Sequence, residues 1–236
     1  MAKLVTMPPL VIAQADLAKF GTTWTANGGS LSRTPPQSSG DLCEVFDTAV
    51  GIALAIMLGG ITIEKPNGNS LTPAKPNCVE VGPVKVVGGV RPQNFDVGYR
   101  PDGIRFAHDT KTLNDSKSVG KNWQNMVNDL ATEATTVHSR FPHAVVSFIF
   151  ACPLPCIGEP QRSAIIETLE RLGRRQRIED ADFMAEAISL VVWDPIDGSI
   201  HPTVPAQTST LRVEKFSSQV ETAYVSRYKG LPPHAA

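Results

Sequence analysis

The sequence predicts an α/β protein with a central mixed sheet flanked by helices. Two patterns carry this prediction. Hydrophobic residues recur at helical spacing in several segments, and short runs rich in Val, Ile and Phe stand between them. The 236 residues, 42% hydrophobic and 19% charged, suit a globular chain with one sizeable core and exclude a disordered one. We expect a loop-rich segment over residues 1–40 and a single domain over residues 41–236.

A helix and three strands are expected in the first half of the domain. After a short helix over residues 10–20, hydrophobic residues such as Leu42, Phe46 and Ala53 follow a helical period from residue 41 to the glycine pair at 59–60. Three strand-like runs come next, at residues 84–90, 94–99 and 104–113.

A second helix and a buried strand complete the core. Helical spacing of hydrophobic residues runs over 123–141 and stops at Pro142. Residues 143–151 form a continuous apolar run, which is typical of a strand covered on both faces. The core therefore spans 41–151, and an extension over 152–236 adds a helix (162–175), a strand (188–193) and an amphipathic segment (212–228).

The tetrapeptide at residues 100–103, Arg-Pro-Asp-Gly, predicts a hairpin between the second and third strands. Proline presets φ at the second position of a turn, aspartate tolerates the third and glycine suits the fourth. With a four-residue turn, Tyr99 faces Ile104 and Asp96 faces Ala107.

Three chemically active side chains then share one side of the sheet. Side chains alternate along a strand, so Asp109 and Lys111 lie on the side of Ala107 and hence of Asp96. The diagonal between Asp96 and Asp109 is about 7 to 8 Å between Cα atoms. Two carboxylates can hold Mg²⁺, and a nearby ammonium can offset charge that develops on a phosphate. This set suits phosphodiester hydrolysis.

These residues resemble the PD-(D/E)XK nuclease family, which includes many type II restriction endonucleases. The resemblance rests on Asp96 before the turn, on Asp109-Thr110-Lys111 after it, and on the order helix, three strands, helix, strand over residues 41–151. It implies a restriction-endonuclease-like core and Mg²⁺-dependent cleavage of double-stranded DNA. It also implies a sequence-specific enzyme that acts as a homodimer, because two-fold protein symmetry matches a palindromic site.

Two positions of the family pattern stay open. Read literally, the motif begins at Pro101-Asp102, which makes Asp102 the alternative first carboxylate. We prefer Asp96, because Asp102 falls at the hairpin tip, remote from Asp109. In the family a glutamate of the first helix often joins the metal site, and Glu44 is the candidate. An ordinary exposed helix charge explains Glu44 equally well.

Two other functions compete with the nuclease. Residues 194–199, Asp-Pro-Ile-Asp-Gly-Ser, resemble the metal-binding signature of inositol monophosphatase-like sugar phosphatases. That family also expects paired glutamates well upstream, for which Glu179 and Asp180 are a poor substitute, and a turn after a strand explains the hexapeptide without function. The other alternative is a DNA-binding module without catalysis.

Charge gives local rather than global support for DNA binding. The net charge of −1 supplies no overall attraction to nucleic acid. The candidate phosphate contacts are Lys117, Lys121, Arg174 and Arg175.

Compartment signals are few. The first 17 residues lack the pattern of a secretory signal, and no apolar run reaches the roughly 20 residues of a membrane span. The four cysteines are dispersed, with no zinc-ligand spacing, and are interpreted as reduced thiols of a cytoplasmic protein that makes no membrane contact.

Overall fold

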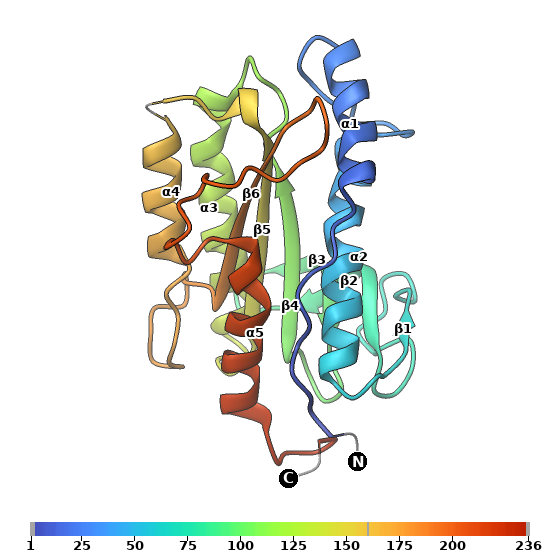
Figure 1. Cartoon of the computed structure of the whole chain (residues 1–236). Helices are drawn as coiled ribbons and strands as arrows, with labels where there is room; N and C mark the ends of the chain where they lie inside the picture. Colours follow the sequence, from blue (N-terminus) through green and yellow to red (C-terminus); the bar gives the residue numbers. More distant parts are fainter. Residues whose placement is uncertain (1–2, 160, 235–236) are drawn as a thin grey trace.

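A six-stranded sheet forms the centre of the molecule (Figure 1). The computed structural model describes residues 3–159 and 161–234. In chain order the elements are α1 (Gln14–Ala26), α2 (Ser39–Met57), β1 (Ile63–Glu64), β2 (Val79–Val87), β3 (Pro92–Tyr99), β4 (Phe106–Thr112), α3 (Val119–His138), β5 (Val145–Pro153), the 3₁₀ turn η1 (Leu154–Cys156), α4 (Gln161–Leu172), β6 (Ala187–Trp193) and α5 (Val213–Tyr228). The strands lie in the order β1-β2-β3-β4-β5-β6.

The sheet is mixed, as the sequence predicts. Strands β2, β3 and β4 are antiparallel neighbours, whereas β4, β5 and β6 run parallel and β1 runs parallel to β2. The order α2, β2, β3, β4, α3, β5 reproduces the expected succession of helix, three strands, helix and strand. Every residue of β5 and β6 is buried, which explains their continuous apolar sequences.

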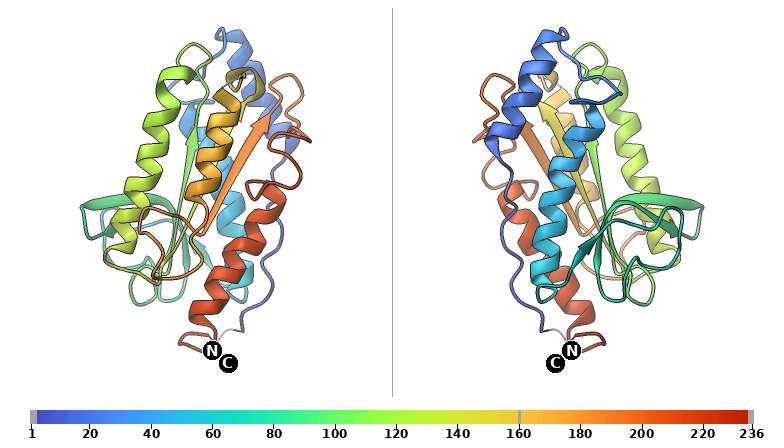
Figure 2. Two further views of the ribbon diagram at one scale, coloured as in Figure 1. Left: turned by 90° about the vertical axis from the view of Figure 1, so that its left-hand side faces the viewer. Right: turned by 90° about the vertical axis from the view of Figure 1, so that its right-hand side faces the viewer.

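Helices cover both faces of the sheet (Figure 2). On one face, His108 of β4 lies 3.6 Å from Asp47 of α2 and packs edge-on against Phe216 of α5. On the other face, Lys111 of β4 contacts Glu133 of α3, and α4 packs against α3 and β6. The C-terminal half of β4 therefore runs between α2 and α3, and this is where the candidate site lies.

Several boundaries differ from the expected ones. Helix α1 extends to Ala26, beyond the expected end at residue 20, and its Leu17 and Trp24 belong to the same hydrophobic core as the sheet. Strand β2 starts at Val79 and contains a β-bulge at which Gly82 adopts φ +127°. The two-residue strand β1 is not predicted by the sequence pattern.

The register of the β3–β4 hairpin differs from the predicted one by two residues. Tyr99 pairs with Phe106 rather than with Ile104, because the connection includes residues 100–105. Arg105 closes this longer loop: its N–H donates to the Tyr99 carbonyl (2.9 Å), and its guanidinium pairs with Asp102. A shift of two keeps every side chain on its predicted face.

The edge strand β6 is covered by the chain that follows it. Trp193 forms a bridge with Ile200, the N–H of His201 donates to Val192 O (2.7 Å), and the N–H of Leu190 donates to Leu211 O (2.9 Å). These bonds satisfy backbone groups that an open edge would expose. Among the described residues, none of the helices combines the length and hydrophobicity needed to cross a bilayer.

Candidate active site

Strands β3 and β4 separate at Asp96 and Asp109. The last paired residues of their ladder are Val97 and His108, so Asp96 and Asp109 stand opposite each other directly beyond it. The N–H of Thr110 donates to Asp96 Oδ2 (3.1 Å) in place of a strand partner. The Asp96 and Asp109 carboxyl groups lie close enough to hydrogen-bond when one of them is protonated.

The two carboxyl groups respond to this crowding in opposite ways. Burial and the hydrogen bond with Asp109 raise the pKa of Asp96. Burial would also raise the pKa of Asp109, but hydrogen bonds with Asp96 and Lys111 hold it below its ordinary value. Asp109 therefore ionises more readily than Asp96.

Lys111 completes the predicted trio. Its ammonium group contacts the Asp109 carboxylate and donates to Glu133 Oε1 (2.9 Å). Burial alone would lower the pKa of Lys111, but the two carboxylates raise it, so the ammonium stays charged. The structure thus brings Asp96, Asp109 and Lys111 together.

Glu133 is a site residue that the sequence analysis missed. It is 3% exposed, Gln93 Nε2 donates to its Oε1 (3.0 Å), and its Oε2 has no hydrogen-bond partner within the described part of the chain. Burial and the charge of Asp109 raise its pKa. Its spacing in the sequence could have identified it. Glu133 follows Leu130 by three residues and precedes Val137 by four, so it lies on the hydrophobic face of its helix, where a carboxylate is unusual.

Asp47 was missed as well. It is buried on α2 and accepts a hydrogen bond from Thr110 Oγ1 (2.5 Å). Thr110 Oγ1 also contacts His108 Nε2 (3.1 Å), and His108 Nδ1 contacts Ser147 Oγ (3.0 Å). Burial raises the pKa of Asp47 and lowers that of His108 to about 3, so His108 is neutral. This chain of polar groups supports the backbone of β4 beneath the site.

A cavity of about 600 Å³ opens onto the two aspartates. Glu44 is exposed at its rim, one helical turn before Asp47. The residues that line it are Gly40, Cys43, Glu44, Asp47, Lys65, Pro66, Val81, Gly82, Pro83, Asp96, Asp109 and Thr110. The β2 bulge thus forms part of the wall, and Lys65 adds an exposed positive charge.

Asp102 lies away from this cavity. Its side chain is 60% exposed and pairs with Arg105, which also donates to the Pro232 carbonyl (2.6 Å). The structure therefore gives Asp102 a role in closing the β3–β4 loop and does not bring it to Asp109.

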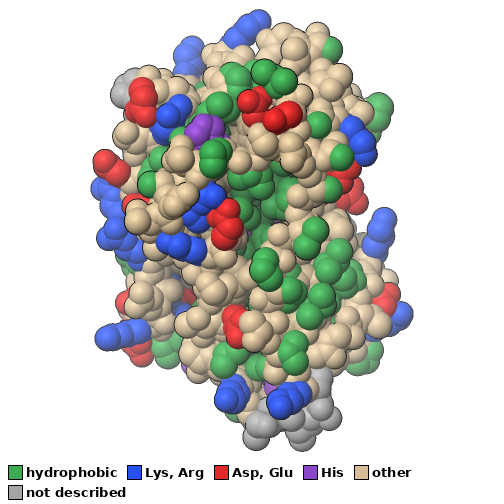
Figure 3. Space-filling view, in the orientation of Figure 1, with side chains coloured by type: hydrophobic (Ala, Val, Ile, Leu, Met, Phe, Trp, Pro, Cys, Tyr) green, Lys and Arg blue, Asp and Glu red, His purple; other side chains and the backbone are tan. Residues whose placement is uncertain are grey.

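The predicted phosphate contacts divide into two groups. Lys117, Lys121 and Arg174 are exposed. The prediction for Arg175 is wrong, because its side chain is fully buried and forms an ion pair with Glu186 (3.1 Å). On the face shown in Figure 3, acidic and basic side chains are interspersed rather than gathered into one basic surface.

The hexapeptide at residues 194–199 forms a compact turn after β6. Asp194 Oδ1 accepts from the N–H of Ile196 (2.8 Å), and Asp197 Oδ1 accepts from the N–H of Ser199 (2.8 Å). Gly198, with φ +77°, packs so closely on α1 that a Cβ would lie 2.2 Å from the Gln14 carbonyl oxygen. Both aspartates cap their own loop, which accounts for the hexapeptide structurally.

Within residues 3–159 and 161–234, no group of three or more His, Cys, Asp and Glu side chains is arranged to hold a metal ion. No protein-family model, curated protein or solved structure matches the chain.

Proposed function

We propose that this protein is a divalent-metal-dependent endonuclease that hydrolyses DNA phosphodiester bonds, with a restriction-endonuclease-like core and cleavage at a specific sequence. The observation that carries the proposal is the meeting of Asp96, Asp109 and Lys111 where β3 and β4 separate. As a restriction enzyme it would act as a homodimer, because each protomer contributes one such site and a duplex has two strands to cut.

The donor groups fit Mg²⁺. This ion is usually held by one or two protein carboxylates, with waters and substrate phosphate oxygens completing its six ligands. Asp96 and Asp109 supply such a pair, and the raised pKa of Asp96 beside Asp109 supports the proposal, because a cation would offset the repulsion between two neighbouring carboxylates. When bound, Mg²⁺ lowers the pKa of an attacking water and neutralises charge on the phosphate.

The neighbouring side chains have distinct tasks. Hydrolysis adds water across a P–O bond, and negative charge grows on the phosphate oxygens as the bond breaks. Lys111 donates to one of these oxygens, and it is held in place by Asp109 and Glu133. Glu133 is a positioning residue for Lys111, because its buried Oε1 accepts hydrogen bonds from both Lys111 Nζ and Gln93 Nε2.

The rim of the cavity meets the substrate. Lys65 offers an exposed ammonium to a phosphate beside the scissile one. Glu44, also at the rim, can hold a water of the metal's coordination shell. Lys117, exposed in the turn before α3, and Lys121, exposed in its first turn, are suited to phosphates further along the strand.

We expect the purified protein to cut plasmid or phage DNA into discrete fragments when Mg²⁺ is present. Discrete bands follow from base contacts concentrated at a short site, whereas a smear on the gel would indicate a nonspecific nuclease. Ca²⁺ occupies carboxylate sites but organises an attacking water poorly, so it should support DNA binding without cutting. Efficient cleavage in Ca²⁺ or in a chelator would contradict the metal mechanism.

The same assay separates the competing functions. DNA binding without cleavage under any divalent metal would favour a non-catalytic DNA-binding module. Release of phosphate from a sugar phosphate, lost in Asp194→Asn and Asp197→Asn, would favour the phosphatase instead.

Asp96→Asn and Asp102→Asn should have different effects. Asp96→Asn should reduce Mg²⁺-dependent cleavage by about 100-fold or more, because one of two metal-binding carboxylates is lost. Asp102→Asn should retain cleavage and lose stability through the Arg105 pair that closes the hairpin loop. Initial cleavage rates and thermal melting of both variants test this, and the opposite pattern would make Asp102 the metal ligand.

A further inference from the structure

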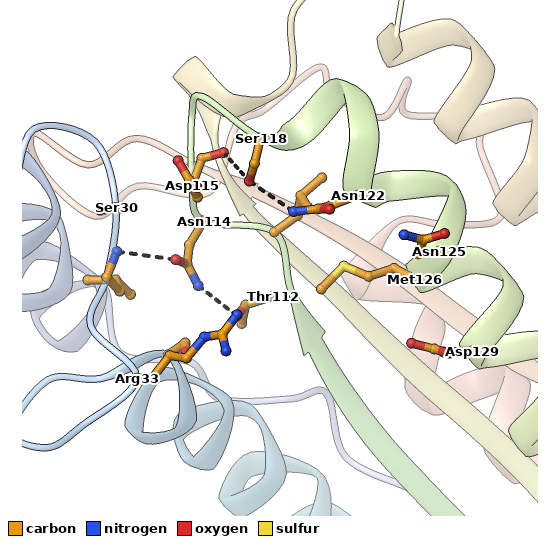
Figure 4. Close-up of a pocket in the computed structure, with 13 residues that line it drawn as sticks. Ser30, Arg33, Thr112, Asn114, Asp115, Ser118, Asn122, Asn125, Met126 and Asp129 are labelled. Atoms are coloured by element: carbon orange, nitrogen blue, oxygen red, sulfur yellow. Dashed lines mark hydrogen bonds between the residues drawn. The ribbon is translucent and has the colours of Figure 1, made fainter.

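A second cavity, of about 470 Å³, adjoins the candidate site (Figure 4). It lies between the loop over residues 27–38 and the first half of α3. Thr112 lines it directly after Lys111 on β4, and Ser39 lines it next to Gly40, which belongs to the first cavity. The two cavities therefore follow each other along β4 and α2.

Polar side chains on α3 connect this cavity with the site. Asn122, Asn125 and Asp129 line it, and Glu133 continues the series at the site. Spacings of three, four and four residues place all four on one side of the helix. Asparagine is a weak helix former, so local helix stability does not explain the amides on this side.

Four side chains of the cavity have hydrogen-bonding groups available to a ligand. Arg33 is exposed, and its guanidinium has no hydrogen bond or ion pair with any described residue. The side chains of Asn125 and Asp129 are likewise without a partner in residues 3–159 and 161–234, and Asn122 uses only one amide hydrogen, toward Ser118 Oγ (2.9 Å). In Figure 4 these groups surround one open space.

The balance of charge indicates which part of a nucleic acid fits here. One cation, Arg33, faces two carboxylates, Asp115 and Asp129, so the cavity does not attract phosphate. Base edges instead present donors and acceptors side by side, which arginine, asparagine and aspartate side chains match. The lysines at 117 and 121 lie outside this lining, at the start of α3, where flanking phosphates are expected.

We propose that this cavity reads base edges of the DNA that the adjacent site cuts, with Arg33, Asn122 and Asn125 as the reading side chains. The inference rests on the proposed function. Asn114, which also lines the cavity, follows Lys111 by three residues, so the cavity begins next to the proposed catalytic lysine.

The test compares sequence preference in matched variants. Duplexes with a randomised segment are bound to the full-length protein in Ca²⁺, recovered and sequenced, and the same proteins are assayed for plasmid cleavage in Mg²⁺. Wild type should enrich one short motif. Arg33→Ala and Asn125→Ala should each lower the preference at one or two positions by roughly 5- to 150-fold, while binding to nonspecific duplex changes little.

Two exposed residues outside the cavity serve as controls. Asn128→Ala changes the same residue type one helical turn from Asn125, and Arg91→Ala changes an arginine in the turn before β3. Both variants should retain the wild-type motif. All four substitutions are at exposed positions, and thermal melting verifies that the fold is intact.

The inference is overturned if wild type enriches no motif, or if Arg33→Ala and Asn125→Ala keep the wild-type one. If wild type still cuts DNA in Mg²⁺, the proposed endonuclease activity stands in either case, but without an enriched motif its sequence specificity is overturned as well. Conversely, a motif that depends on Arg33 and Asn125 without cleavage in Mg²⁺ supports base reading and overturns the endonuclease proposal.

Discussion

Lys111→Met is expected to reduce Mg²⁺-dependent DNA cleavage by a factor of about 100 to 1000 or more. The Lys111 ammonium contacts Asp109, and charge that stabilises a transition state in a buried site contributes on this scale. Methionine keeps the length of the side chain and fills the same space. Asp109→Asn should have an effect of similar size, because it removes the charge of a proposed metal ligand while keeping the shape of the group.

The measurement is the initial rate of plasmid nicking at saturating Mg²⁺, with duplex binding in Ca²⁺ measured in parallel. Binding by Lys111→Met should stay close to that of wild type, because the substitution affects the chemical step. Lys229→Ala, an exposed lysine after α5, is the matched control and should cut normally. Near-normal rates in both site variants would show that Asp109 and Lys111 do not form the catalytic centre.

Arg175→Ala is expected to destabilise the fold by about 3–5 kcal/mol, the usual cost of breaking a buried ion pair from one side. Arg175 pairs with Glu186, and it donates to the carbonyls of Asp180 (2.6 Å) and Ile178 (2.9 Å). Its loss leaves these acceptors without a donor. Glu186 keeps three partners among the described residues, the N–H of Val146 (2.7 Å), His138 (3.3 Å) and Arg227 (2.8 Å), so the fold is weakened rather than abolished.

Arg174→Ala is the matched control, because Arg174 is the exposed neighbour of Arg175 in the chain. Its free energy of unfolding should stay within about 0.5 kcal/mol of wild type. Urea unfolding of the two variants gives both values. Equal stability of Arg174→Ala and Arg175→Ala would contradict the buried ion pair and make Arg175 available again as a phosphate contact.

Local pattern was sufficient for the element order and for the three predicted side chains of the site. Helical and strand periods depend on residues a few positions apart, and they predicted α2, β3, β4, α3 and β5 within about four residues and β2 with a start five residues late. The convergence of Asp96, Asp109 and Lys111 followed from alternation along two strands. The predicted β3–β4 register was wrong by two residues, but the convergence still held, because a shift of two residues keeps each side chain on the same face of the sheet.

The register itself needed the tertiary structure. The Pro-Asp-Gly segment predicts a four-residue turn. In the structure, however, Arg100 Nε forms an ion pair with Oε2 of the buried Glu80 (2.5 Å), and the Arg105 guanidinium forms an ion pair with Asp102. These pairs make residues 100–105 one loop and place Asp96 directly opposite Asp109. Glu80 is twenty positions from Arg100, so no turn rule includes it.

The sequence by itself determined which strands carry the candidate site and which of their side chains share a face, because both properties follow from patterns that repeat every two to four residues. Only the tertiary structure decided that Asp47 and Glu133 join the site and that Arg175 is buried. Asp47 and Glu133 contact β4 across 63 and 22 positions of the chain, and Arg175 packs among groups as distant as Pro142. Such contacts form only when helices pack on the sheet, since burial and charge pairing depend on proximity in space rather than on order in the chain.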